Sequence, residues 1–238
     1  MNQLYKQRDQ GFMAVSVQMK LNEELYLRDP QETKLGKSII QYSIILIDEI
    51  GFEGFTFKKL AERINSTEAS IYRYFENKHL LLVYLVSWYW EWMKFRIQFN
   101  TMNVDDPIKK LKIVLPIIVD TAKRNTSIDF VDEDILHRIV VAESTKAYHT
   151  KNVDKENQKG FFWSYKSVSI SIADIIEEIN PDFPYPRALA SNLLDMGNNH
   201  IYYAQHLPSL TDIRLEDPAD LKDIVKLLEF FVLKLVKE

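Results

Sequence analysis

The fold is decided by residues 56–78, which read TFKKLAERINSTEASIYRYFENK. Apolar residues recur here every three or four positions, as they do on the buried face of a helix. The polar triplet Asn65-Ser-Thr67 interrupts that pattern, and Asn tolerates a positive φ better than other residues with a side chain. Thr56, Thr67 and Asn77 each stand where a side-chain oxygen can cap the start of a helix. The stretch therefore predicts two short helices, joined by a tight polar turn and followed at once by a third.

A longer helix is expected just before this stretch, at residues 34–50. Ile39, Leu46 and Ile50 share one face of it, and Gly51 follows where helices often end in a left-handed conformation. Together these elements predict a tri-helical helix-turn-helix. Its last short helix, expected at residues 68–75, is narrow enough to enter a DNA major groove, which is about 12 Å wide.

The outward face of that predicted recognition helix carries groups suited to phosphates and base edges. These residues are Glu68, Ser70, Arg73 and Tyr74, with Tyr72 at the edge. Hydroxyls and a guanidinium are the groups that such contacts require. Glu68 either accepts a hydrogen bond from a cytosine amino group or only stabilises the start of the helix.

Lys78 falls in the first turn of the following helix, where its charge opposes the helix dipole by ~0.3–1 kcal/mol. We therefore expect Lys78 to face an anionic group. The free amides at the same helix start would also attract a phosphate.

The remainder of the chain is predicted to be helical, which makes the fold class all-α. Glycine is scarce, at 6 residues, and short alternating runs typical of strands are hard to find. Helices are expected at about 77–99, 106–123, 132–148, 156–179, 186–207 and 219–236. Pro116 is expected to kink its helix, and Pro186 suits the first position of another.

We expect three parts along the chain. Residues 1–32 form an N-terminal extension, which is either a short extra helix or a partly disordered arm. Residues 33–80 form the helix-turn-helix domain, and residues 81–238 form a helical effector-binding and dimerisation domain.

Composition narrows the possible functions. The chain has no cysteine, which excludes disulfides and thiolate chemistry and suits a reducing cytoplasm. The net charge is −4, yet the segment 33–80 is +1, which leaves −5 for the rest. The five histidines have no metal-ligand spacing, and no glycine-rich phosphate loop or nucleophile motif occurs. We therefore expect no metal, no cofactor and no enzymatic activity.

The sequence gives no sign of a membrane segment. The longest apolar stretch, residues 80–90, is far shorter than the ~20 residues that span a bilayer. The N-terminus lacks a convincing signal peptide. A soluble cytoplasmic protein is expected.

Aromatic residues in the second half are candidates for an apolar pocket that binds an aromatic or lipophilic effector. The residues chosen are Trp88, Trp92, Trp163, His200 and Tyr203. Ordinary core packing is the alternative for each of them.

The last two predicted helices, 186–207 and 219–236, are candidates for a homodimer interface. The first has two apolar stripes, and one of them is rich in small residues such as Ala190 and Gly197. A helix that is apolar on two faces must bury both, which would suit a four-helix interface across a two-fold axis. The alternative is a monomer in which both faces are internal.

The motif between residues 39 and 81 resembles the DNA-binding domain of TetR/AcrR-type regulators. The resemblance rests on Ile39-Ile40, Gly51-Phe52, Thr56, Leu60-Ala61, Thr67, Ile71-Tyr-Arg-Tyr-Phe75, Lys78 and Leu80-Leu81. The sequence departs from the family at Asn65, Ser66 and Ala69, where glycine, a hydrophobic residue and glycine are usual.

The resemblance implies a homodimer that binds a palindromic double-stranded DNA operator and a C-terminal domain that binds an inducer. It also implies phosphate contacts and base contacts from the third helix. The phosphate contacts are Thr56, Thr67, Tyr72, Tyr74 and Lys78, and we add Lys58 to the DNA-binding set.

The function expected is thus a ligand-responsive transcriptional regulator, and such proteins are more often repressors. Effector binding would shift the helix at 77–99 and change the ~34–36 Å separation of the two recognition helices. Two alternatives stay open: an all-α small-molecule-binding protein, and a protein-interaction module that has kept the fold and lost DNA binding.

Overall fold

A computed structural model describes residues 18–119, 130–217 and 220–237. Within these ranges the regular structure is helical, without a strand, and the all-α prediction is confirmed. The α-helices are α1 (Lys34–Gly54), α2 (Phe57–Arg63), α3 (Glu68–Tyr72), α4 (Lys78–Thr101), α5 (Pro107–Val119), α6 (Glu133–Glu143), α7 (Thr145–Tyr148), α8 (Val153–Gln158), α9 (Trp163–Ile179), α10 (Pro186–His206) and α11 (Lys222–Lys237).

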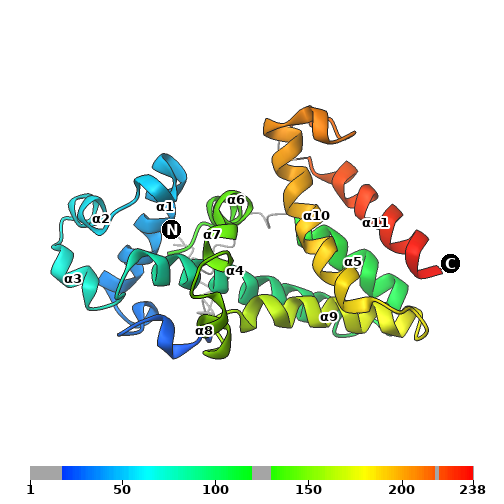
Figure 1. The fold of residues 1–238 in the computed structure, drawn as a ribbon, viewed down its shortest axis with the longest axis horizontal. Helices are drawn as coiled ribbons and strands as arrows, with labels where there is room; N and C mark the ends of the chain where they lie inside the picture. Colours follow the sequence, from blue (N-terminus) through cyan, green and yellow to red (C-terminus); the bar gives the residue numbers. More distant parts are fainter. Residues whose placement is uncertain (1–17, 120–129, 218–219, 238) are drawn as a thin grey trace, which may run out of the picture.

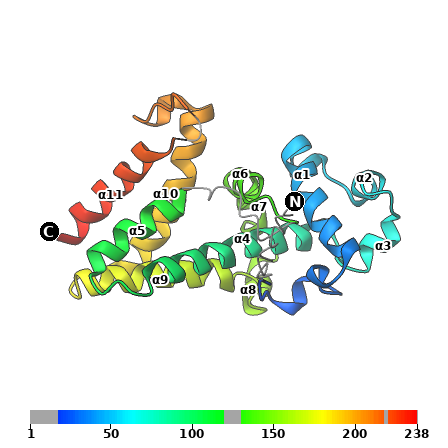
Figure 2. The ribbon, with the colours of Figure 1, turned by 180° about the vertical axis from the view of Figure 1, so that it is seen from behind.

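Helix α4 connects the two ends of an elongated molecule. Helices α1, α2 and α3 form one end, and α5, α10 and α11 form the other, as both views show (Figures 1 and 2). Helix α9 packs along α4 and also contacts α10 and α5, while α6 lies against α1 and α4. A movement within the helical body can therefore reach the helix-turn-helix through α4 or through the contact between α6 and α1.

Local capping builds the helix-turn-helix as expected. The side chains of Thr56, Thr67 and Asn77 each accept the amide three residues further on, at 3.2, 3.2 and 2.9 Å. Asn65 has φ 50° and is the only residue other than glycine with a positive φ in the described ranges. The predicted starts of α2, α3 and α4 and the turn between α2 and α3 are confirmed.

Helix α1 is broken at Gly51, where its end was predicted, and a further helical turn follows. Gly51 adopts φ 70° and ψ 160°, as a left-handed position requires, but helical structure resumes and runs to Gly54. The kink frees the amide of Phe52, which donates to Oε1 of Glu143 at 3.0 Å. A residue 91 positions away in the sequence therefore stabilises a break that local pattern reads as a helix end.

Two long predicted helices are divided. The helix expected at 156–179 is broken by Gly160, which has φ 79°, so that α8 and α9 meet at a corner. The helix expected at 132–148 forms α6 and α7. Pro186 opens α10 as predicted, and the predicted end of the helix at 106–123 lies outside the described residues.

The N-terminal strap, residues 18–33, is neither a helix nor a loose arm. It forms two 3-10 turns, η1 (Glu23–Leu25) and η2 (Pro30–Glu32), and buries Met19, Leu21 and Leu25. The side chain of Gln31 bonds both backbone groups of Met19, accepting at 3.1 Å and donating at 2.8 Å, and so closes the strap on itself. The first 17 residues of the predicted extension lie outside the described residues.

The small-residue stripe of α10 packs within the chain. Ala190, Leu194 and Gly197 are buried, and a Cβ at Gly197 would lie 3.0 Å from Ile118 of α5. The prediction that this stripe forms part of the dimer surface is therefore corrected, because α5 packs against it. On α11, by contrast, the apolar side chains of Phe230, Phe231 and Leu235 are exposed.

Candidate DNA-binding surface and ligand site

The start of α2 and the whole of α3 present the predicted DNA-contacting side chains. Thr56, Lys58, Thr67, Glu68, Tyr72 and Arg73 are exposed, and Ser70 is half-buried. The rings of Phe57 and Tyr72 meet edge to face with centroids 5.0 Å apart, so that α2 holds the end of α3. Ser70 also shares a hydrogen bond of 2.9 Å between its hydroxyl and that of Thr67. Hydroxyl groups and a guanidinium thus lie together on one rigid corner of the molecule.

Tyr74 is not part of that exposed face. Helix α3 ends at Tyr72, and the turn that follows directs the Tyr74 ring into the core, where the residue is 3% exposed. Its hydroxyl shares a 2.8 Å hydrogen bond with Oγ1 of Thr33, and its carbonyl accepts the amide of Leu27 at 2.8 Å. The outward placement of Tyr74 expected from helical periodicity is wrong because the helix is too short to include it.

Lys78 faces neutral backbone carbonyls of the chain itself and not the anionic group expected of it. Its Nζ donates to the carbonyls of Phe52 at 3.0 Å and Phe55 at 3.2 Å, and it lies 4.7 Å from the centroid of the Phe52 ring. These carbonyls form the negative end of α1, where a cation is favourable. A phosphate contact from Lys78 stays a prediction.

The predicted effector residues do not converge on one site. Trp88 and Trp92 are buried in α4 with ring centroids 6.3 Å apart, whereas Trp163 at the start of α9 is 60% exposed. His200 and Tyr203 lie on α10, and His200 shares a 2.8 Å hydrogen bond with Oγ1 of Thr211. Trp163 alone of the five lines the cavity described next.

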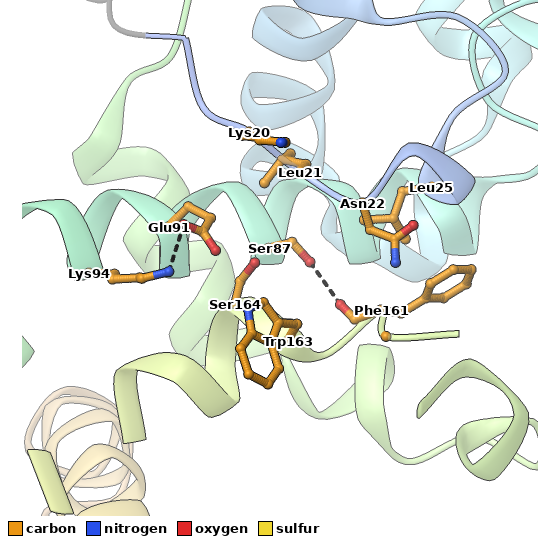
Figure 3. A pocket seen from close by; sticks show the side chains of 11 residues that line it. Lys20, Leu21, Asn22, Leu25, Ser87, Glu91, Lys94, Phe161, Trp163 and Ser164 are labelled. Atoms are coloured by element: carbon orange, nitrogen blue, oxygen red, sulfur yellow. Dashed lines mark hydrogen bonds and ion pairs between the residues drawn. The ribbon is translucent and has the colours of Figure 1, made fainter. Parts of the chain in front are cut away.

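A cavity of about 500 Å³, the strap cavity, lies between the N-terminal strap, α4 and the start of α9 (Figure 3). It is lined by Lys20, Leu21, Asn22, Leu25, Ser87, Glu91, Lys94, Gly160, Phe161, Trp163 and Ser164. These residues come from three separate parts of the sequence, so their proximity could not be deduced from spacing. The walls combine apolar side chains with two lysines, a carboxylate and two hydroxyls, a composition suited to a small amphipathic molecule.

A second cavity of about 650 Å³ lies between α1, α6 and α10. Arg138 of α6 reaches across it to Asp48 of α1 through two hydrogen bonds of 3.0 and 2.8 Å. His137 also lines it and is stacked on Tyr89 with centroids 5.5 Å apart. The hydrogen bonds between Arg138 and Asp48 join the helix-turn-helix end of the molecule to the helical body.

His137 should make the stability of the protein depend on pH. Burial lowers the pKa of His137 to about 4, although a hydrogen bond with Asn198 acts in the opposite direction. The folded state therefore holds His137 neutral, while the unfolded state binds a proton below its ordinary pKa of about 6.5. The resulting stability is complete above pH ~6.5 and is lost as the pH falls towards 4, by up to about 3 kcal/mol.

Urea unfolding at a series of pH values checks this prediction. His137→Gln should flatten the decline in the free energy of unfolding between pH ~6.5 and ~4 by about 3 kcal/mol. His149, which is exposed, provides the control variant His149→Gln. Equal slopes for His137→Gln and the unchanged protein would contradict the assignment.

Comparison with known proteins agrees with this architecture. Residues 39–85 match the family described as "Bacterial regulatory proteins, tetR family". The resemblance inferred from the sequence is confirmed over these residues, which form a TetR-type N-terminal domain. No curated protein matches the sequence closely.

Several solved structures share the fold at low identity. AibR in complex with isovaleryl coenzyme A and operator DNA has a TM-score of 0.57 at 17% identity, over 84% of this chain and 97% of that one. The fatty acid degradation regulator FadR from Bacillus halodurans has a TM-score of 0.53 at 16% identity, over 80% and 92%. The superantigen PfiT has a TM-score of 0.57 at 14% identity, over 87% and 98%. At such identities the likeness concerns the fold alone.

The described part of the chain carries neither a membrane span nor a metal cluster. No helix in it combines the length and the apolar character needed to cross a bilayer. No three histidine or acidic side chains gather there in a way that would hold a metal ion.

Proposed function

We propose that the protein is a ligand-responsive transcriptional regulator that binds operator DNA through α3 and has no enzymatic activity. The observation that carries this proposal is the exposed polar face of α2 and α3, held rigid by capped helix starts and by the Phe57–Tyr72 contact. A five-residue helix fits a major groove, and exposed hydroxyls together with Arg73 suit phosphates and base edges. We propose accordingly that the protein acts in the cytoplasm, where its DNA target would lie.

A homodimer that binds a palindromic operator is part of the proposal. Two recognition helices must be presented about 34–36 Å apart to read two half-sites on one side of the duplex. Helix α11 supports such an assembly, because Phe230 is 60% and Leu235 50% exposed in the single chain. Burial of these side chains against a second copy would remove an apolar surface from water.

A small-molecule effector completes the proposal. The strap cavity and the cavity between α1, α6 and α10 are both large enough for a small ligand, and the second is lined in part by α1 of the helix-turn-helix end. AibR was solved with both a ligand and operator DNA bound, which supports the same pairing of functions here. Repression is the simplest outcome, because effector binding need only disturb the geometry of two recognition helices.

A protein-interaction module is the second candidate function. Glu68 is exposed on the recognition helix, where a carboxylate would repel phosphates, and the superantigen PfiT shares the fold. One fold can serve unrelated functions, so the exposed face of α3 has to be tested directly.

Selection of binding sites from random duplex DNA tests the proposal. We expect an inverted repeat, since a two-fold dimer recognises two equivalent half-sites. On the selected site Arg73→Ala should weaken binding, and it should reduce the slope of log K against log [salt] by ~1 if the guanidinium contacts a phosphate. Arg187→Ala, an exposed arginine on α10, is the matched control. Failure to enrich any sequence at low salt would favour the interaction module.

A further inference from the structure

We infer that the strap cavity is the effector site and that it selects a small molecule with one oxyanion group on an apolar body. This inference rests on the proposed function for its regulatory meaning, although binding itself can be tested without DNA. It concerns a cavity whose roof is the N-terminal strap and whose floor is the start of α9 (Figure 3).

The start of α9 supplies unused hydrogen-bond donors. The helix has 17 residues, begins at Trp163 and has no side-chain cap. The amide of Trp163 donates to the carbonyl of Gly160 and that of Lys166 to the carbonyl of Phe162, which leaves the amides of Ser164 and Tyr165 without an acceptor within the helix. An uncapped helix start of this length attracts negative charge. By itself this feature would not define a site.

Ser164 provides the second, independent observation. Ser164 is 7% exposed and lines the strap cavity. Its hydroxyl has no hydrogen-bond partner among the described residues. In Figure 3 the hydroxyl is directed from α9 towards α4, into the space that a ligand would occupy. The nearby Ser87 differs, because its hydroxyl already donates to the carbonyl of Phe161 at 3.3 Å. The Ser164 hydroxyl faces the cavity and is not sealed from water, so a bound oxyanion would accept its hydrogen bond in place of water.

The charges around the cavity favour an anion. Lys20 and Lys94 line it together with a single carboxylate, Glu91, which gives a net charge of +1. The Nζ of Lys94 lies 3.6 Å from a carboxylate oxygen of Glu91, so these two charges largely offset each other. Lys20 and the α9 amides therefore determine the sign of the electrostatic potential in the cavity. Lys20 and Lys94 supply positive charge to the same cavity, and the Glu91 carboxylate would discourage a second anionic group.

The remaining walls are apolar and set the character of the ligand body. Leu21 and Leu25 come from the strap, and Phe161 comes from the corner before α9. Trp163 adds an indole ring that is 60% exposed, which leaves one of its surfaces free for a ring of the ligand. The cavity therefore fits one oxyanion at the α9 end and an aromatic or short aliphatic group beneath the strap.

The strap connects this site to the DNA-binding end. Asn22 donates to the carbonyl of Lys159 at 2.7 Å, which ties the roof of the cavity to the corner before α9. Five residues later, the amide of Leu27 donates to the carbonyl of Tyr74, just beyond α3, at 2.8 Å. A ligand that lifts or tightens the strap would thus act on the end of the recognition helix without passing along α4.

Calorimetric titration of the full chain without DNA tests the inference with three probes of similar size. Benzoate and phenyl phosphate carry the oxyanion, and benzamide is the neutral analogue. We expect saturable binding of at least one of the two anions, and weaker binding of benzamide by about tenfold or more, which corresponds to about 1.4 kcal/mol. Whichever anion binds more tightly distinguishes a carboxylate from a phosphate ligand.

Matched variants locate the bound anion. Ser164→Val and Lys94→Met should each weaken anion binding about tenfold. Ser171→Val, on the same helix but outside the cavity, should leave it unchanged. Absence of saturable anion binding, equal binding of benzamide, or equal affinities in Ser164→Val and Ser171→Val would each overturn the inference. Because no DNA is present, none of these results depends on whether an operator is found.

Discussion

Gly36→Ala is expected to detach the N-terminal strap and to lower the free energy of unfolding by ~1–3 kcal/mol. A Cβ on Gly36 would lie 2.3 Å from the carbonyl oxygen of Pro30 and 2.5 Å from its Cα. Both atoms belong to the backbone and cannot rotate away, so α1 or the strap must shift. Pro30 opens the turn η2, and the strap between η2 and the cavity would move with it.

Two measurements check this expectation, and Gly54→Ala serves as the control in the same helix. The nearest atoms to a Cβ at Gly54 are side-chain carbons of Ile50 at 3.6 Å, an ordinary contact. Urea unfolding should therefore separate Gly36→Ala from Gly54→Ala by ~1–3 kcal/mol. Hydrogen exchange at the amide of Leu27, which bonds to Tyr74, should become faster only in Gly36→Ala. Equal stability of the two variants would show that the strap adapts to a methyl group at Gly36.

Elements governed by neighbouring residues could be predicted from the sequence. Thr56, Thr67 and Asn77 cap helices because a short side chain needs to reach only three residues ahead. Asn65 makes its turn for an equally local reason. The tri-helical motif follows from these positions together with apolar spacing, so its prediction did not require knowledge of the tertiary fold.

Residues with distant partners were predicted less well. Periodicity assigns Tyr74 to the outer face of a helix, but its hydroxyl pairs with Thr33, 41 positions earlier. The sequence suggested an anion near Lys78, but the groups that Lys78 contacts are neutral carbonyls at the end of α1, 23–26 positions earlier. Local signals specify how a chain segment turns, and only tertiary packing decides what a side chain then meets.

The candidate ligand site was the hardest part to predict. Aromatic content pointed to Trp88 and Trp92, which pack in the core, whereas the strap cavity depends on where the strap crosses α4 and α9. Ser164 gives no motif, and its significance comes from an uncapped helix start combined with burial. Gly160 was the one available signal, because a glycine within a predicted helix can mark a corner.

Lys78→Met is expected to destabilise the folded protein by about 1–2 kcal/mol in the absence of DNA. Hydrogen bonds from a charged group to the carbonyls of Phe52 and Phe55 contribute about 1.5–3 kcal/mol, and a methionine cannot donate them. Removal of a positive charge from the first turn of α4 acts in the opposite direction by ~0.3–1 kcal/mol. The sign of the change in the free energy of unfolding therefore distinguishes two roles for Lys78. A loss of stability indicates that Lys78 caps the end of α1, and a gain indicates that its position is unfavourable for folding and serves DNA binding.

Urea unfolding of Lys78→Met and of the control Lys58→Met makes this comparison. Lys58 is exposed at the start of α2, has no hydrogen-bond or ion-pair partner among the described residues, and should change stability by no more than about 0.5 kcal/mol. If Lys78→Met proves as stable as Lys58→Met, or more stable, the contact with α1 contributes little. A reduction of the salt slope by ~1 on the selected operator would then assign Lys78 to a phosphate. If Lys78→Met is destabilised and the salt slope is unchanged, Lys78 acts by joining α4 to the end of α1, and the DNA-contacting surface is confined to the exposed residues of α2 and α3.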